Sequence, residues 1–194
     1  MNRIYCLVWN HCQQAWVAAP ETARARGKRA LAAVATALVA SSAVALPMGG
    51  AVSVGQGDIS QSGATLSVNQ QSQKLAVNWN SFSIGANETV NFQQPNSSAI
   101  ALNRIVGSDP SQIYGHLNAN GQVFLLNPNG VLFAPGSQVN VSGLVASTFW
   151  LADADFVADQ FRFSGVTGNV VNQGNLTAAE GGYIALLGGQ VSNQ

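Results

Sequence analysis

The chain has 194 residues, of which 47% are hydrophobic and 8% are charged, so a sizeable core is possible and disorder throughout is excluded. The net charge is zero but unevenly placed: residues 1–29 carry five basic residues and one acid, and the rest carries three basic residues and seven acids. A basic head on a mildly acidic body argues against nucleic acid as the main partner and favours a cationic targeting segment. Both cysteines, Cys6 and Cys12, lie in that head, which excludes a disulfide scaffold or a thiolate zinc site from the body.

The first 45 residues have the organisation of a secretory signal peptide. Residues 30–46 are uncharged and rich in alanine, and they follow four basic residues within 24–29. The small residues Ala-Val-Ala at 43–45 then form a cleavage signal, so we expect cleavage after Ala45, with Ala43 or Ala51 as alternatives. A transmembrane helix is the competing interpretation. It is disfavoured because the segment has only the minimum spanning length and consists largely of weakly hydrophobic alanine.

The stretch before the apolar segment is unusually long for a cationic start, and it reads MNRIYCLVWNHCQQAWVAAPETARARGKRAL. It resembles the extended signal-peptide region of type V secretion proteins, which include autotransporters and two-partner secretion exoproteins. The resemblance implies Sec export into the periplasm of a Gram-negative bacterium, slowed at the inner membrane to limit misfolding. An arbitrary basic amphipathic leader is the alternative.

The body, residues 46–194, takes its polarity from amides rather than charges. It contains 16 Asn and 14 Gln against 10 charged residues, together with 19 Gly. Amides can pair with copies of themselves one strand spacing away, whereas like charges stacked at that distance repel, so this composition suits stacked parallel strands. Alternating apolar residues predict short strands, and no segment predicts a helix of ten or more residues. Four groups are each expected to share one strand face: Leu75, Val77 and Trp79; Val90 and Phe92; Ile100 and Leu102; Val123 and Leu125.

Short internal repeats support a solenoid. The segment 170–173 recurs at 191–194, an offset of 21 residues, and the pattern Gly-x-Leu-x-Ala at 130–134 recurs at 174–178, an offset of 44. A period of 20–25 residues built of short strands with Asn and Gly corners indicates a β-solenoid. Leucine-rich repeats share that period, but their characteristic leucine pattern is missing. Coincidental repetition in a chain of low complexity remains the alternative.

The segment Asn127-Pro128-Asn129-Gly130 predicts a tight turn. Pro128 presets φ, Asn129 tolerates bridge or left-handed backbone, and Gly130 accepts a positive φ. Apolar strands flank the turn on both sides, which is the pattern expected where one sheet of a solenoid turn ends and the next begins.

The turn lies within the segment 122–148, which reads QVFLLNPNGVLFAPGSQVNVSGLVAST. This segment resembles the secretion domain of filamentous haemagglutinin-type exoproteins of the two-partner secretion (type Vb) family, and the resemblance extends over the sequence from residue 50 onward. The resemblance implies an all-β fold: a right-handed parallel β-helix (a single-stranded solenoid) with a small antiparallel N-terminal cap and an extra-helical hairpin or loop, expected at 149–163. It implies a secretion-targeting and folding-nucleating domain, recognised by the POTRA domains of a partner outer-membrane β-barrel transporter and folded outside the cell. The absence of cysteines from 46–194 agrees with export of an extended chain.

The family has two Asn-Pro-Asn turns, and here the first is only approximated, by Gln94-Pro95-Asn96-Ser97. Gln replaces the leading Asn, which weakens a role for Gln94, while Pro95 and Asn96 still supply turn chemistry. Partner recognition is therefore expected at 127–130, with Pro95 and Asn96 as further members of the motif set. The resemblance also implies a secreted or surface-exposed adhesin, with a host glycan or cell-surface receptor bound through regions downstream.

Residues that could carry catalysis or bind metal are few. His116 has no carboxylate near it in sequence and is expected to be structural. Asp153, Asp155 and Asp159 could bind calcium or form a polysaccharide-lyase site, but a solvated extra-helical loop is expected, because the EF-hand glycine and glutamate are absent. We therefore expect no enzyme activity, cofactor or metal. The alternative function is a secreted β-helical carbohydrate-active enzyme such as a polysaccharide lyase. The chain ends at Gln194 inside what reads as a new turn, which is expected of a fragment, a truncated gene or a very short relative. The unpaired last strand predicts dimerisation or aggregation.

Overall fold

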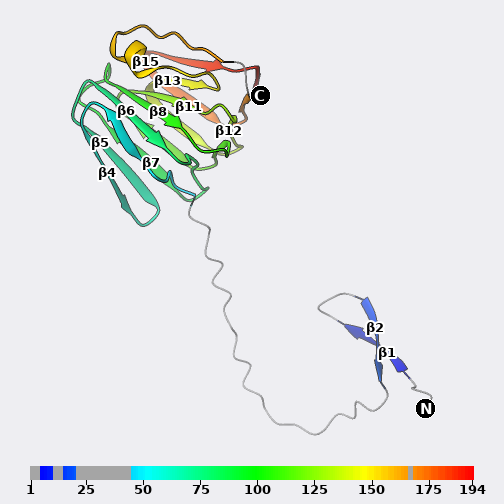
Figure 1. Cartoon of the computed structure of the whole chain (residues 1–194). Coiled ribbons are helices and arrows are strands. Elements are labelled where there is room, and N and C mark those ends of the chain that lie inside the picture. The colour runs from blue at the N-terminus through cyan, green and yellow to red at the C-terminus, as the bar shows by residue number, and fades with distance from the viewer. Residues whose placement is uncertain (1–4, 11–14, 21–44, 166–167) are drawn as a thin grey trace. The chain divides into compact units, whose positions relative to one another are not determined.

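A computed structural model of the chain describes residues 5–10, 15–20, 45–165 and 168–194 (Figure 1). The chain divides into two compact units, residues 1–41 and 42–194. In the first unit, β1 (Tyr5–Asn10) and β2 (Ala15–Pro20) pair as antiparallel strands, which the sequence analysis did not predict. The predicted signal-peptide segment 30–46 lies outside the described residues except for its last two. Within the described ranges, no helix is long and apolar enough to cross a membrane.

The second unit begins with an antiparallel cap, as expected. Strand β3 (Ala51–Val54) pairs antiparallel with β6 (Lys74–Trp79). Between them, β4 (Gly57–Ser62) and β5 (Thr65–Gln70) form an antiparallel hairpin. Gly63 closes the hairpin at φ +56°, in the left-handed region that glycine adopts at low cost. The cap occupies the start of the solenoid, from which the parallel strands continue.

From β5 and β6 onward the strands pair in parallel and wind into a β-solenoid of about five turns (Figure 1). The winding produces three faces. The first face holds β5, β7 (Thr89–Gln93), β10 (His116–Ala119) and the first parts of β13 (Gln138–Ser147) and β15 (Asn175–Leu187). The second holds β6, β8 (Ile100–Ile105), β11 (Gln122–Leu126) and the second parts of β13 and β15. The third holds β9 (Ser111–Ile113), β12 (Val131–Phe133), β14 (Asn169–Asn172) and β16 (Gln190–Asn193).

The strand register confirms one of the two predicted repeats. Val170 lies opposite Val191, which is the predicted offset of 21 residues. The offset of 44 is wrong, because the two segments lie on different faces: Leu132 is in β12 and pairs with Val171, whereas Leu176 is in β15. The cause is an inserted excursion of the chain between β13 and β14, which lengthens that turn and breaks the simple periodicity.

Alternation along the strands sorts the apolar side chains into an interior and an exterior core. The solenoid interior buries Leu75, Val77 and Trp79 on one strand and Val123 and Leu125 on another. Ile100 and Leu102 lie on the same side of their strand, as predicted. That side points outward, where the two residues form a second core with Phe124 and Phe156. The six residues of β8 are consequently all buried, so its two polar side chains, Asn103 and Arg104, need hydrogen-bond partners within the protein, and both have them.

Stacked amides connect successive turns, as the composition predicts. Asn118 Nδ2 donates to Asn91 Oδ1 at 3.1 Å, and Asn140 Nδ2 donates to Asn118 Oδ1 at 3.2 Å. On the third face, Asn172 Nδ2 donates to Asn193 Oδ1 at 2.7 Å. A neutral amide both donates and accepts, so each copy satisfies the next without charge repulsion.

The excursion expected at 149–163 is present between the end of β13 and the start of β14. It contains an antiparallel bridge between Trp150 and Ser164 and one short helix, α1 (Asp153–Val157). Phe156 on α1 and Leu151 before it are completely buried against the outward side of the second face, which β6, β8 and β11 form. The excursion therefore covers the sheet rather than projecting from it.

Candidate functional site at the Asn127–Gly130 corner

The predicted turn at 127–130 lies at the corner between the second and third faces, between β11 and β12. Gly130 N donates to Asn127 O at 3.1 Å, which closes the turn, and Gly130 has φ +124°. Asn127 N donates to Ser147 O, on the following turn of the solenoid. The corner is thus enclosed between neighbouring turns, directly beside the point where the excursion leaves β13.

The Asn127 side chain is fully buried and makes every hydrogen bond that an amide of this geometry needs. Its Nδ2 donates to Asp109 O at 2.9 Å and to Ser111 Oγ at 3.0 Å. Its Oδ1 accepts from the backbone N of Asn129 at 3.0 Å and from Asn129 Nδ2 at 3.1 Å. Its exposure is 0%. In the folded domain, Asn127 is therefore out of reach of a partner protein.

The two central residues of the turn are the accessible ones. Asn129 is exposed and Pro128 is half-buried. Asn129 Nδ2 also donates to Gly107 O at 2.9 Å, which fastens the turn to the previous one. Of the predicted motif, only Pro128 and Asn129 present a surface to solvent, whereas Asn127 and Gly130 are buried.

The turn expected from Gln94 to Ser97 is displaced. The closing bond runs from Ala99 N to Asn96 O at 3.2 Å, so the turn covers 96–99 and Pro95 precedes it. Asn96 Oδ1 accepts from Ser98 N at 3.0 Å, which is an Asx turn that starts at Asn96. Pro95 and Asn96 are both exposed and lie between β7 and β8, at the corner between the first and second faces, whereas 127–130 lies between the second and third. The structure does not bring the two motifs together into one site.

Gln94 is a buried corner residue, which sequence reasoning did not recognise. It is 7% exposed, and its Nε2 lies 3.0 Å from Gln70 Oε1, 2.9 Å from Ala99 O and 3.2 Å from Gln122 O. Asn120 adds bonds to its backbone, with Oδ1 accepting from Gln94 N at 2.7 Å. The signal available in the sequence was the spacing of amides at 70, 94 and 120, which matches the length of the early solenoid turns.

A buried arginine holds the excursion beside the corner. Arg104, 3% exposed, stacks over Trp150 at 5.1 Å and approaches Asp153 Oδ1 at 2.6 Å as an ion pair. It also donates to Leu151 O at 3.3 Å and to Ser53 Oγ at 2.9 Å. One guanidinium therefore joins the N-terminal cap strand β3 to the excursion.

A lysine supports the other end of α1. Lys74 Nζ donates to Phe156 O at 3.0 Å and to Val157 O at 2.8 Å, which are carbonyl groups in the last turn of the helix. It also pairs with Asp159 Oδ1 at 2.7 Å. Cations in this position satisfy carbonyl groups that lack helical partners.

The remaining candidate residues have structural surroundings. Asp153 and Asp159 pair with cations and keep exposed side chains, so the acidic cluster lies on a solvated extra-helical segment, as predicted, and that segment is also docked on the sheet. Within the described ranges, no three His, Cys, Asp or Glu side chains come close enough together to hold a metal ion. His116 begins β10, with Thr89 and Gln138 as its neighbours on adjacent strands.

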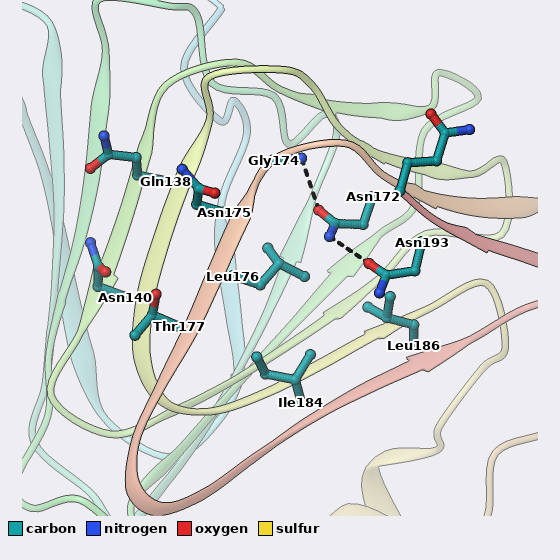
Figure 2. Close-up of a pocket in the computed structure, with 11 residues that line it drawn as sticks. Gln138, Asn140, Asn172, Gly174, Asn175, Leu176, Thr177, Ile184, Leu186 and Asn193 are labelled. Atoms are coloured by element: carbon teal, nitrogen blue, oxygen red, sulfur yellow. Dashed lines mark hydrogen bonds between the residues drawn. The ribbon is translucent and has the colours of Figure 1, made fainter.

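A pocket of about 790 Å³ lies at the end of the last described turn. Figure 2 shows Leu176, Ile184 and Leu186 pointing into it, with Asn172 and Asn193 bonded to each other at its rim. Leu176 and Leu186 pack against the interior core, so the pocket continues the interior of the solenoid. The other lining residues are mostly amides, among them Gln138, Asn140 and Asn175.

Comparison with known proteins identifies the family. The model of the TPS (two-partner secretion) domain matches residues 43–194, which is the whole solenoid. The chain belongs to the two-partner secretion family. A second model, the extended signal peptide of the type V secretion system, matches residues 1–50. The two-partner secretion domain and the extended signal peptide together indicate Sec export and secretion or surface display in a Gram-negative bacterium. A cognate outer-membrane transporter is implied, and the family is one of secretion domains rather than enzymes.

Related proteins agree with this assignment. The solved secretion domain of HMW1 from Haemophilus influenzae has a TM-score of 0.73 and 32% identity, over 76% of this chain and 41% of that one. Two proteins from Haemophilus influenzae, each named heme/hemopexin-binding protein, are 44% identical over 108 residues and 42% identical over 99 residues. These matches cover 56% and 51% of this chain but only 12% and 11% of the relatives.

Proposed function

We propose that this domain directs the chain to the POTRA domains of its partner outer-membrane β-barrel and then nucleates folding outside the cell. The observation that carries the proposal is the match of the two-partner secretion domain to the entire solenoid, residues 43–194. The stacked architecture supports the second part, because each turn supplies the edge on which the next one pairs. An exoprotein of this type acts as a surface adhesin, with its host receptor bound by regions outside this domain.

The geometry of the corner favours recognition of Asn127 before folding. In the folded domain its amide is fully buried with four hydrogen bonds, so a partner could reach it only on an extended chain. After export, the same amide fixes the corner between the second and third faces. One residue thus serves the transporter first and the fold afterwards, while Pro128 and Asn129 remain accessible in both states.

The test compares Asn127→Ala with a matched variant, Asn103→Ala. Asn103 is also 0% exposed, accepts from Trp79 Nε1 at 3.0 Å and lies outside the motif. Each substitution leaves buried polar groups unsatisfied, and we expect each to lower stability by about 2–4 kcal/mol. If Asn127 is recognised, its loss reduces secretion through the partner barrel far more than the loss of Asn103 does.

Secretion that falls equally in both variants would make Asn127 a structural corner only. Pro128→Ala provides a milder comparison. It mainly increases the conformational entropy of the unfolded chain, which lowers the free energy of unfolding by about 0.4–1 kcal/mol. Secretion is measured as protein released per cell in the presence of the partner barrel, and stability as the urea midpoint of the purified domain.

A further inference from the structure

A buried carboxylate meets the start of the solenoid unit. Glu88, 6% exposed, accepts hydrogen bonds from the backbone N of Ala45, at 2.9 Å to Oε1 and 3.1 Å to Oε2. Oε2 also accepts from Gly85 N at 2.7 Å. Both carboxylate oxygens are therefore directed at the backbone nitrogen of one residue, 43 positions earlier in the chain.

This carboxylate differs from the other acids that contact the solenoid. Asp153 and Asp159 each face a cation, Arg104 or Lys74, although both are substantially exposed. Glu88 is far more buried, yet within the described part of the chain it has no ion-pair partner and receives only neutral amide N–H groups. A buried charge is costly unless it is paired, so the site is built for a stronger donor than an amide.

The position of Ala45 supplies that donor. It is the last residue of the predicted cleavage signal at 43–45, and cleavage here hydrolyses a peptide bond with one water. The upstream segment leaves with a new carboxylate, and the downstream segment gains an amino group that is protonated at neutral pH, because its ordinary pKa is about 7.7–8.0. We propose that Glu88 is the acceptor for the α-ammonium group that signal-peptide cleavage creates, and that this ion pair locks the N-terminal cap only after processing.

Cleavage after Ala45, the predicted position, removes the nitrogen that contacts Glu88 in the precursor and puts the ammonium on the adjacent nitrogen, that of Leu46. Cleavage one residue earlier would put the ammonium on the contacting nitrogen itself. Leu46 is 3% exposed, and Met48 N donates to Ser81 O at 2.9 Å, so the chain is held in place from this point onward. The precursor offers a neutral amide there and the processed chain a cation, so cleavage strengthens the cap.

The experiment compares the full precursor and the processed chain recovered after export, each with Glu88 or with Glu88→Gln. Mass spectrometry first establishes that the processed chain starts at residue 45 or 46; a start at 44 or 52 would overturn the proposal. At pH 7, Glu88→Gln is expected to lower the equilibrium constant favouring the folded state about tenfold in the processed chain, equivalent to about one pKa unit of interaction. In the precursor we expect less than a twofold change, because glutamine still accepts from an amide.

The pH dependence gives a second readout. A carboxylate partner raises the pKa of the α-ammonium in the folded state, so its contribution is complete below the ordinary value and is lost as the pH rises through the folded-state value. His116, whose backbone N donates to Glu88 O at 3.0 Å, is the titratable residue on the adjoining strand β10. Measurements from pH 7 to 10 cover the range in which the α-ammonium group loses its proton.

A chemical control needs no substitution. Acetylating the α-amino group of the processed wild-type chain restores a neutral amide at the same nitrogen, and it also replaces the precursor if that form fails to refold. Acetylation should reproduce the loss of stability caused by Glu88→Gln and make the further effect of that substitution small. If Glu88→Gln is equally damaging with a free and an acetylated terminus, or if the effect does not diminish between pH 7 and 10, Glu88 only accepts backbone amides and the proposal is wrong.

Discussion

Replacing Arg104 with Met should release the excursion from the solenoid. The guanidinium is 3% exposed, and its loss removes the donors to Leu151 O and Ser53 Oγ and leaves Asp153 without its cation. Removing one partner of a buried ion pair typically costs 3–5 kcal/mol. Because the Asp153 side chain is 42% exposed, water compensates part of that cost, and we expect a loss of about 2–4 kcal/mol. Methionine keeps much of the apolar stem, so packing changes little.

Lys74→Met is the matched comparison, because Lys74 holds the other end of α1. Its partner Asp159 is 69% exposed, so the ion pair contributes about 0–1 kcal/mol, and two bonds to backbone carbonyls are lost with it. Urea denaturation should rank Arg104→Met as the more damaging change. Limited proteolysis should cut the excursion at 149–165 much faster in that variant than in the wild type. Equal stability of Arg104→Met and the wild type, or an excursion that stays protected from the protease, would refute the conclusion that Arg104 clamps the excursion to the solenoid.

Four further outcomes follow from the sequence and the structure. Circular dichroism of residues 46–194 should show β structure with little helix, and a strong helical signal would contradict the fold. Mass spectrometry of exported material should find cleavage directly after Ala45, and a retained N-terminus would contradict the signal peptide. Burial raises the pKa of the Tyr183 phenol, so its protonated form is favoured on folding and stability should fall as the pH rises above about 10; Tyr183→Phe should remove that phase of the pH titration. Asn118→Asp should destabilise the domain by about 0.5–1.5 kcal/mol, because its carboxylate cannot donate to Asn91, and urea midpoints at pH 7 will show whether it does.

The sequence predicted the fold through chemistry that repeats. Asn and Gln in place of charges predicted stacked amides, and the pairing of Asn172 with Asn193 follows directly from the repeat at offset 21. The corner at 127–130 was also predictable, because Pro128 restricts φ locally and Gly130 accepts the positive φ that the turn requires. These features depend on neighbours in sequence or on one repeat length, which is why a single sequence reveals them.

Features that depend on non-local packing were not predictable. The burial of Ile100 and Leu102 on the outward side of their strand depends on an excursion some 50 residues later, which covers that side and makes it a second core. The same excursion lengthens one solenoid turn, so the segments that match at an offset of 44 do not stack on one another. The structural role of Gln94 was missed because it consists of hydrogen bonds to Gln70 and Gln122 on adjoining turns, and no local pattern encodes those contacts. The burial of Asn127, which decides how a partner can reach it, also appears only when the turns are stacked.

The clamp at Arg104 also sets how the domain should respond to mechanical force. Pulling from the C-terminal side would peel β16, β15 and then β14 away, and each step breaks the bonds of a single strand edge. The next step must detach β13 together with the excursion, whose anchors reach back through Arg104 and Lys74 to the first strands of the domain. Resistance should therefore rise abruptly after the last turn has unravelled, so the excursion would act as a mechanical stop that keeps the N-terminal turns intact under load.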